Sequence, residues 1–362
     1  MNRKHLAAAA ATLALVAAGA TTAPATAVVA DAPSSKTIVK NLLSPLSLAV
    51  SDDGTVYYSQ NFAGQLFSKS PGKKPVQHFQ GKKGEEVGAV SEHHGSVRFA
   101  TTGKKKLLWG IGGSGKPVKM ADLGAYEAEK NPDAGAHYGF ETITPGCAQQ
   151  LPTGPEAPPA QYTGIVDSHP YGSAIDGSTT YVADAGANAI LAVKGNGKIK
   201  TVALIPGVPV VITQEIATAI GFPNCTVGLT YVLEGVPTDV EKGSDGKLYV
   251  STLTGGPEDG STGALSKVYK INPKTGAVKL LADNLFSATG VAVADNGDVY
   301  VSQLFPGTIS RIKKGKSVAK PYYSSKLTAA VEWTEDGLYA TTNALTGLEP
   351  GSSPRGKVVW IG

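Results

Sequence analysis

The chain has little of what marks several large classes of protein. Its 362 residues include only two cysteines without CxxC spacing, so cysteines alone cannot build a zinc site. Aromatic residues make up 7%, which predicts an aliphatic core. Beyond the N-terminal region, no apolar run approaches the roughly 20 residues that a membrane helix needs, so no membrane span is expected. Neither a GxSxG nor an HExxH motif occurs, which removes the best markers of serine esterases and zinc peptidases.

An excess of charge of one sign is also missing. The sequence has 33 Lys and Arg residues against 29 Asp and Glu residues. The lysines at 104–106 and 313–316 stand in turn-like segments and not on aromatic strands. This distribution predicts solvated turns and no nucleic-acid groove.

The N-terminal segment has the pattern of an export signal. Arg3 and Lys4 precede an apolar run at 6–20, and the small residues at 25–27 form a cleavage site. We expect a signal peptide over residues 1–27 and a secreted, extracellular mature chain. A retained N-terminal anchor is the alternative. In an exported protein, the pair Cys147 and Cys225 favours a disulfide bond over two free thiols.

What the chain has in abundance is one repeated pattern. A small residue and apolar residues lead to Asp or Asn before Gly, and then to an apolar–Tyr–apolar run that ends in Ser or Ala. The six copies lie at 45–59, 86–100, 170–183, 237–251, 288–302 and 328–340. Repeats of strands and tight turns with a period of about 40–55 residues are typical of β-propellers.

Two further strand-like runs follow each copy, except that the last copy lacks its fourth strand. The segment 36–43 (KTIVKNLL) resembles a fourth strand and precedes the first copy, so we expect it to pair with 357–361 and close the ring. The sequence therefore predicts an all-β fold, a six-bladed β-propeller with four-stranded blades, as a single domain over residues 28–362. An open solenoid is the alternative.

Two insertions interrupt the repeats, at 123–168 and 207–235. Connections from fourth to first strands and from second to third strands share one face of a propeller, here called the top face. We expect both insertions to form a cap there, tied by a bridge between Cys147 and Cys225. The segment 122–130 predicts a short helix, and 152–159 predicts irregular chain.

The first insertion and the third repeat carry a resemblance to a known family. The segments are 126–128 (YEA), 131–133 (NPD), 167–172 (DSHPYG) and 181–188 (YVADAGAN). With 236–240, 255–257 and 267–269, they resemble the ScyD/ScyE family over essentially the whole mature chain. The resemblance implies an exported bacterial six-bladed propeller of the NHL-like kind, and it implies no catalytic residue set.

One charged residue stands out at the top of the predicted inner strands. Asp239 aligns with small or neutral residues in the other repeats, and a charge near a crowded shaft needs a partner. The neighbouring candidates for a ligand site are Gln60, Glu86, His169, Tyr171, Asp184, Thr238 and Gln303. Asp239 and Glu86 offer oxygen ligands for Ca²⁺, and His169 beside either carboxylate suits general acid–base chemistry. Purely structural roles are the alternative for all of them.

Two functions follow from these residues. The first is a binding or scaffold protein, a monomer whose partner is a small molecule or an extracellular protein. The second is a metal-assisted lyase or lactonase-like enzyme that uses Asp239, Glu86 and His169. Fold likeness does not choose between them.

Overall fold

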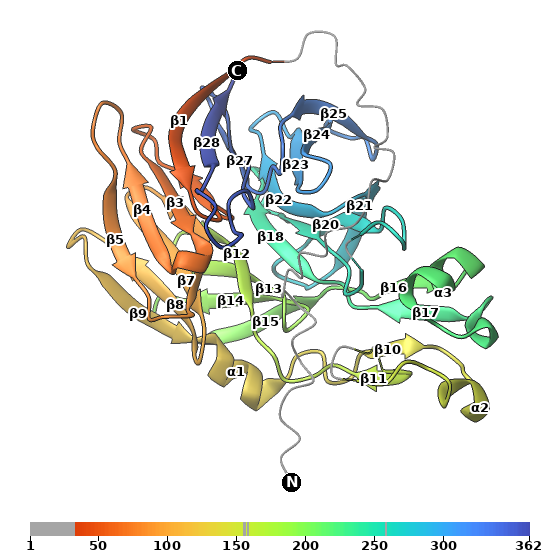
Figure 1. The fold of residues 1–362 in the computed structure, drawn as a ribbon. Coiled ribbons are helices and arrows are strands. Elements are labelled where there is room, and N and C mark those ends of the chain that lie inside the picture. The colour runs from red at the N-terminus through yellow and green to blue at the C-terminus, as the bar shows by residue number, and fades with distance from the viewer. Residues whose placement is uncertain (1–32, 155–156, 158, 258) are drawn as a thin grey trace.

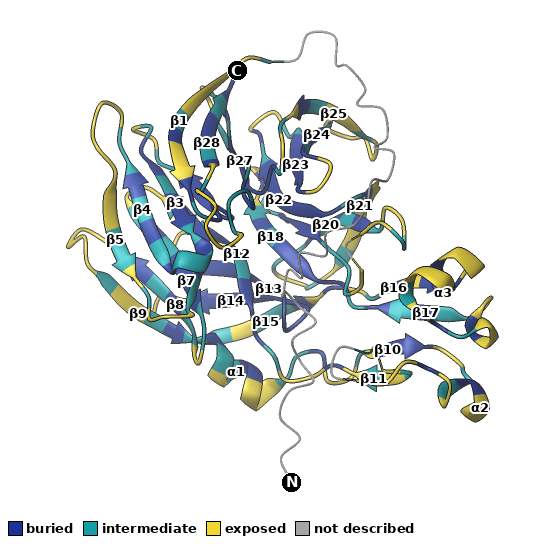
Figure 2. Cartoon of the chain, viewed as in Figure 1, coloured by how far each residue is buried: buried dark blue, intermediate teal, exposed yellow. Residues whose placement is uncertain are grey.

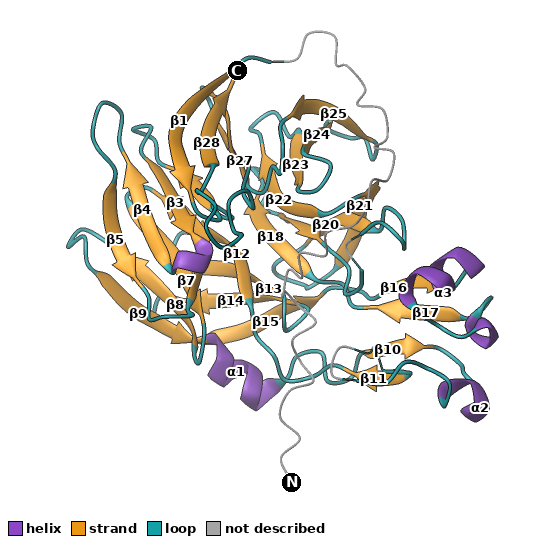
Figure 3. Cartoon of the chain, in the orientation of Figure 1, coloured by secondary structure: helices purple, strands orange, loops and turns teal. Residues whose placement is uncertain are grey.

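The chain folds almost entirely into strands (Figure 3). The computed structural model describes residues 33–154, 157, 159–257 and 259–362, and the expected signal peptide at 1–27 lies outside them. The described residues form seven antiparallel sheets of four strands each (Figure 1). The prediction of an all-β fold is confirmed.

Six of the sheets run from an inner to an outer strand, five of them in the order of the sequence and the sixth with β1 as its outer strand. The first three contain β2 (Leu48–Val50), β3 (Val56–Gln60), β4 (Gln65–Lys69) and β5 (Val76–Gln80); β6 (Glu86–His93), β7 (Ser96–Thr102), β8 (Lys106–Ile111) and β9 (Pro117–Asp122); and β12 (Pro170–Asp176), β13 (Thr179–Asp184), β14 (Ala189–Lys194) and β15 (Ile199–Leu204). The next two contain β18 (Pro237–Lys242), β19 (Leu248–Thr252), β20 (Ser266–Ile271) and β21 (Val278–Leu285); and β22 (Ala288–Val293), β23 (Val299–Gln303), β24 (Thr308–Ile312) and β25 (Ala319–Ser324). The last contains β26 (Val331–Thr334), β27 (Gly337–Thr342), β28 (Gly356–Ile361) and β1 (Ser35–Leu42).

The first strands of these six sheets lie side by side in a closed circuit. β2 contacts β6, and the contacts continue through β12, β18, β22 and β26 back to β2. Within each sheet the second strand returns through a tight hairpin. Gly54, Gly246 and Gly297 each follow Asp or Asn in these turns and have φ of 77°, 72° and 86°. A glycine adopts such positive φ values without steric cost, which explains the repeated Asp/Asn-Gly pair.

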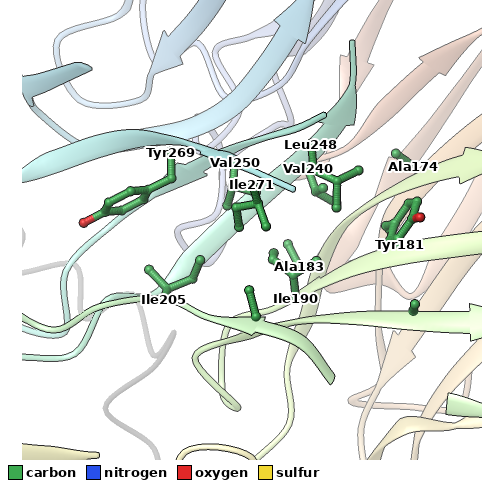
Figure 4. Packing of buried hydrophobic residues seen from close by; sticks show 12 residues of the cluster. Ala174, Tyr181, Ala183, Ile190, Ile205, Val240, Leu248, Val250, Tyr269 and Ile271 are labelled. Atoms are coloured by element: carbon green, nitrogen blue, oxygen red, sulfur yellow. The ribbon is translucent and has the colours of Figure 1, made fainter. Parts of the chain in front are cut away.

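The core lies between neighbouring sheets and is mainly aliphatic, as the low aromatic content predicts (Figure 2). Figure 4 shows one such cluster, in which Val240, Val250 and Ile271 of one sheet face Ala183 and Ile190 of the next. Side chains two residues apart on a strand point to the same face, so each strand supplies alternate residues to one such cluster. Each fully buried aliphatic side chain of this size contributes about 1.5–3 kcal/mol to stability.

The N-terminal and C-terminal strands share one sheet. β1 pairs antiparallel with β28, with Ser35 opposite Ile361 and Thr37 opposite Val359. The predicted pairing of 36–43 with 357–361 is confirmed. The outer edge of the last sheet is therefore completed by the start of the described chain.

The two insertions build the seventh sheet together. Its strand order is β11 (Gln161–Thr163), β10 (His137–Phe140), β17 (Thr230–Leu233) and β16 (Val208–Val211), so two strands come from each insertion. The sequence predicts a cap but does not reveal these strands, because each is only three or four residues long and too short to show a clear alternation. This sheet, here called the accessory sheet, projects from the ring (Figure 1).

Helices are short and are mostly confined to the insertions. They are α1 (Leu123–Lys130), α2 (Pro145–Ala148), α3 (Gln214–Ile220) and the 3-10 turns η1 (Asn61–Ala63) and η2 (Asn224–Thr226). The predicted helix at 122–130 is confirmed, and the Asp122 carboxylate caps it by accepting from the Ala125 N–H at 3.0 Å. In the part of the chain that the structure describes, no helix is both long and apolar enough to cross a membrane.

A disulfide joins the two insertions. Cys147 at α2 is bonded to Cys225 at η2, which confirms the predicted pair. Around it, Phe140, Ile216 and Tyr231 belong to a hydrophobic cluster of the accessory sheet and its helices. The accessory sheet therefore has a core of its own and a covalent bond across it.

Deleting β1 tests whether the ring depends on its last pairing. A chain that begins at residue 44 leaves β28 with an unpaired edge, and unpaired edges promote aggregation. We expect loss of soluble monomer in size-exclusion chromatography and a lower melting temperature. A chain that begins at Ser35 keeps the pairing and is the control. A truncated chain with the melting temperature of the control would contradict this role of β1.

Candidate functional site

The top face brings two of the predicted site residues together. Glu86 begins β6, His169 precedes β12, and these two first strands are neighbours in the circuit. The Glu86 Oε2 lies 3.2 Å from the His169 Nε2. Burial lowers the pKa of His169, but the hydrogen bond and charge of Glu86, with smaller effects of Asp184 and Asp167, outweigh it and raise the pKa above its usual value. Glu86 therefore favours the protonated form of the His169 imidazole.

Asp184 holds the segment that carries His169. Its carboxylate is fully buried at the end of β13 and accepts from the Ser168 Oγ at 2.7 Å and from the His169 N–H at 2.6 Å. A weaker contact joins it to the Ala187 N–H at 3.4 Å. Burial raises the pKa of Asp184, and these hydrogen bonds oppose the rise. Asp184 thus fixes the backbone beside His169 and does not face the passage with it.

Gln60 and Gln303 repeat this device in two other sheets. Each is the last residue of a second strand, and each side chain accepts a backbone N–H of the connection before the first strand, from Leu43 at 2.9 Å and from Phe286 at 2.8 Å. The Thr238 Oγ1 similarly donates to the Ala288 backbone carbonyl at 2.9 Å. These predicted site residues are committed to backbone partners, so the geometry favours their structural reading.

Asp239 lies in the passage enclosed by the first strands. Its two carboxylate oxygens accept from the Val240 and Val291 N–H groups, each at 2.9 Å. A Cβ at Gly172 would come within 2.6 Å of the Asp239 Cα, so only glycine permits this close approach of β12 to β18. Burial raises the pKa of Asp239 to about 7 against the effect of the two hydrogen bonds.

Two further carboxylates, which sequence analysis missed, line the passage. Glu241 lies on β18, two residues beyond Asp239, and Glu332 lies on β26. Burial raises the pKa of both, and the charges of Glu332 and Asp239 on Glu241, and of Asp239 and Glu92 on Glu332, raise it further. The signal was available for Glu241, because side chains two residues apart on a strand share one face.

The passage is narrow. One cavity within it has a volume of about 10 Å³ and is lined by Tyr171, Asp239, Glu241 and Glu332 together with apolar residues. A second, also about 10 Å³, is lined by Asn61, Thr102, His169 and Tyr171. The Tyr171 ring thus borders both hollows, and its centroid lies 6.2 Å from that of His169. Each hollow matches one water molecule or ion and not an organic ligand.

The structure gives the two predicted metal ligands different surroundings. Glu86 pairs with His169, whereas Asp239 accepts backbone N–H groups inside the passage. Over residues 33–362, apart from the four that are not described, no group of three His, Cys, Asp or Glu side chains is placed to hold a metal ion. A Ca²⁺ site at Asp239 and Glu86 stays a prediction.

A wider groove lies elsewhere, between the sheets of β20–β21 and β23–β24. Its volume is about 400 Å³, and its lining includes Lys279, Lys313, Lys314 and Lys316 beside Leu280. The turns after first and third strands contribute to it, so it opens on the face opposite the insertions. Sequence analysis placed the lysines at 313–316 in a solvated turn and did not place them around a groove.

Comparison with known proteins supports the fold class. No family model and no curated protein matches the sequence. Among solved structures, an oxidoreductase (glucose dehydrogenase) from Thermus thermophilus is 14% identical with a TM-score of 0.56, covering 91% of this chain and 99% of that one. The PQQ-bound aldose sugar dehydrogenase from Streptomyces coelicolor is 13% identical with a TM-score of 0.53, covering 91% and 100%. A streptogramin B lyase is 13% identical with a TM-score of 0.50, covering 91% and 98%. At these identities the comparison shows a shared β-propeller fold and does not assign a function.

The raised pKa of Asp239 predicts a pH-dependent stability. Its carboxyl binds a proton more tightly in the folded chain than in the unfolded chain, where the pKa is about 4, so the wild type loses stability as pH rises from about 4 to about 7. Between pH 5 and pH 8, the free energy of unfolding of Asp239→Asn should improve by about 2 kcal/mol relative to wild type. Urea unfolding at both pH values, with chelator present, measures this difference.

The exposed Asp295→Asn is the matched control and should follow the wild type at both pH values. If the difference between Asp239→Asn and wild type is the same at pH 5 and pH 8, Asp239 does not titrate in this range.

Proposed function

We propose that this chain is an exported, six-bladed β-propeller that acts as a binding or scaffold protein through its capped top face. The closed circuit of six first strands supports six blades, and the origin of the accessory sheet in two insertions supports its reading as a cap and not as a blade. We further propose a single domain over residues 28–362 and membership of the ScyD/ScyE family, on the motifs quoted above.

The observation that carries this proposal is the contrast between the narrow central passage and the large accessory sheet. The central passage offers only hollows of about 10 Å³, which suit water or an ion. Beside it, the chain devotes two insertions to a disulfide-linked sheet with its own core. A rigid projecting element of this kind favours recognition of a partner over chemistry on an organic substrate inside the ring.

The proposed partner is a small molecule or an extracellular protein, and the proposed state is a monomer. The disulfide supports an oxidising, extracellular location, because such bonds are rare in reducing compartments. Exposed apolar side chains mark the second insertion, with Val211 on β16 at 57% exposure and Val227 after η2 at 38%. We propose that these side chains contribute to the binding surface.

Charge on the accessory sheet tests the proposal. We expect the purified wild type to retain a specific component of the culture fluid from its own source. The double variant Val211→Asp/Val227→Asp should retain at least tenfold less of this component, because burying a carboxylate at an interface is unfavourable. Quantitative mass spectrometry of the retained material measures the loss. Val118→Asp/Val318→Asp changes two valines of comparable exposure outside the insertions and is the control. Equal retention by both double variants would rule out this surface.

One observation favours the second candidate, a metal-assisted lyase or lactonase-like enzyme. The His169–Glu86 pair places a histidine that is held by a carboxylate beside Tyr171 at the top face, and such pairs serve general acid–base catalysis. We expect no turnover above background with a panel of lactones and cyclic esters, with or without Mg²⁺ or Ca²⁺. Metal-dependent turnover that falls at least 100-fold in His169→Ala would overturn the binding role in favour of catalysis.

A further inference from the structure

A second group of buried carboxylates lies where the insertions join the ring, apart from the central passage. Glu127 is in the last turn of α1, Asp133 follows that helix, and Asn188 precedes β14. Each of the three is only 1% exposed. The Asn188 Nδ2 donates to Asp133 Oδ2 and to Glu234 Oε2, both at 2.9 Å, so the first insertion, the ring and the second insertion meet at this amide.

Several oxygens of this group lack donors, although Asp133 Oδ2 accepts from Asn188 and Tyr138. Neither oxygen of Glu127 has a partner in hydrogen-bonding geometry, and the same holds for Asp133 Oδ1, Asn188 Oδ1 and Asn131 Oδ1. These are five of the ten buried side-chain atoms without a partner in the described part of the chain. Leaving buried acceptors unpaired is unfavourable, so a concentration of them in one place indicates that something else binds there.

Negative charge dominates the group, and the positive charge of His169 acts on it only through Asp184 and Asp167. Asp133, Asp167 and Asp184 all lie close enough to Glu127 to act on its ionisation, and Glu234 acts on that of Asp133. No ion pair joins any of these five carboxylates to Lys, Arg or His within the residues that the structure describes. Burial, followed by the charges of Asp184, Asp133 and Asp167, raises the pKa of Glu127 to about 8, and the nearby Asp167 backbone N–H opposes this rise only weakly.

Water, a proton or a cation could compensate such a group. A water molecule donates two hydrogen bonds to these oxygens but leaves their negative charge in place. A single proton on Glu127 gives one donor and satisfies one acceptor, and amide oxygens such as Asn188 Oδ1 do not bind protons at ordinary pH. A cation accepts several of these oxygens at once and also removes the excess charge. The donor set is made only of oxygens, which selects a hard cation.

We propose that Glu127, Asp133 and the Asn188 amide oxygen hold a calcium ion at the junction between the ring and the accessory sheet. Calcium takes six to eight oxygen ligands in flexible geometry, whereas Mg²⁺ demands a near-ideal octahedral arrangement. The ion would bind carboxylates together with amide oxygens, so it does not require three acidic side chains in one cluster. Its binding fixes the accessory sheet on the ring, because Asn188 also contacts Glu234 of the second insertion.

Glu127→Gln is the decisive variant, because this side chain has no well-formed hydrogen bond to lose. Terbium titrated into the calcium-free wild type should give tyrosine-sensitised emission with one site per chain, since the Tyr138 hydroxyl contacts Asp133. Calcium should displace the terbium and raise the melting temperature by about 5 °C at 100 times its Kd. In Glu127→Gln, both the emission and the thermal shift should fall at least tenfold.

Two controls separate this site from others. Glu129→Gln changes an exposed residue of the same helix and should bind as the wild type does. Asp239→Asn changes the passage and should also bind normally, so loss of terbium emission in that variant would assign the ion to the passage and overturn the proposal.

The apo proteins give a second measurement. In chelator, Glu127→Gln should melt above the wild type, because it removes a charge that repels its neighbours, and this order should reverse in calcium. If the wild type ignores calcium and equals Glu127→Gln below pH 6, the group is compensated by protons and the proposal is wrong. If Glu127→Gln does not fold, calcium displacement of terbium from the wild type, with no displacement by equal Mg²⁺, decides the matter.

Discussion

The pairing of β1 with β28 is the constraint on which the rest of the molecule depends. Each of the other blade sheets is built from four successive strands, but this one takes its outer strand from the opposite end of the described chain. Once it forms, the six first strands are held in a circuit, and the narrow passage follows from their close approach at positions such as Gly172. The geometry of the top face is therefore set by a hydrogen-bonded edge far from it in sequence.

The same circuit explains why so many polar residues gather at the top face without forming one site. Every blade must turn from an outer strand to the next inner strand there, and each turn exposes backbone N–H groups that need acceptors. Asp184, Gln60 and Gln303 supply them from equivalent second-strand ends. The side chains of His169 and Glu86 pair with each other and not with the backbone of these turns. Most polar side chains at the top face therefore serve as acceptors for backbone N–H groups, and only the remaining ones are available to a ligand.

The repeats made the fold largely predictable, because strand alternation and Asp/Asn-Gly turns are local signals. The strand at 36–43 and the disulfide were predictable for a related reason, since each completes something visibly unpaired. The accessory sheet was not, because β10 finds its partner β17 across about 90 residues and neither is long enough to show a pattern. Glu332 and the buried group around Glu127 were missed for the same reason, since burial and proximity arise only when distant segments meet.

The two acidic regions differ in a way that bears on what each can do. In the passage, both oxygens of Asp239 accept backbone N–H groups, so its ionised form already has partial compensation from the strands. At the junction, Glu127 accepts no such well-formed bond, and its neighbours add negative charge. Equal acidity therefore does not mean equal need for a cation. The unpaired oxygens at the junction need a cation more than Asp239 does. The junction also lies where both insertions meet the ring, so a cation there would hold the top face in one arrangement.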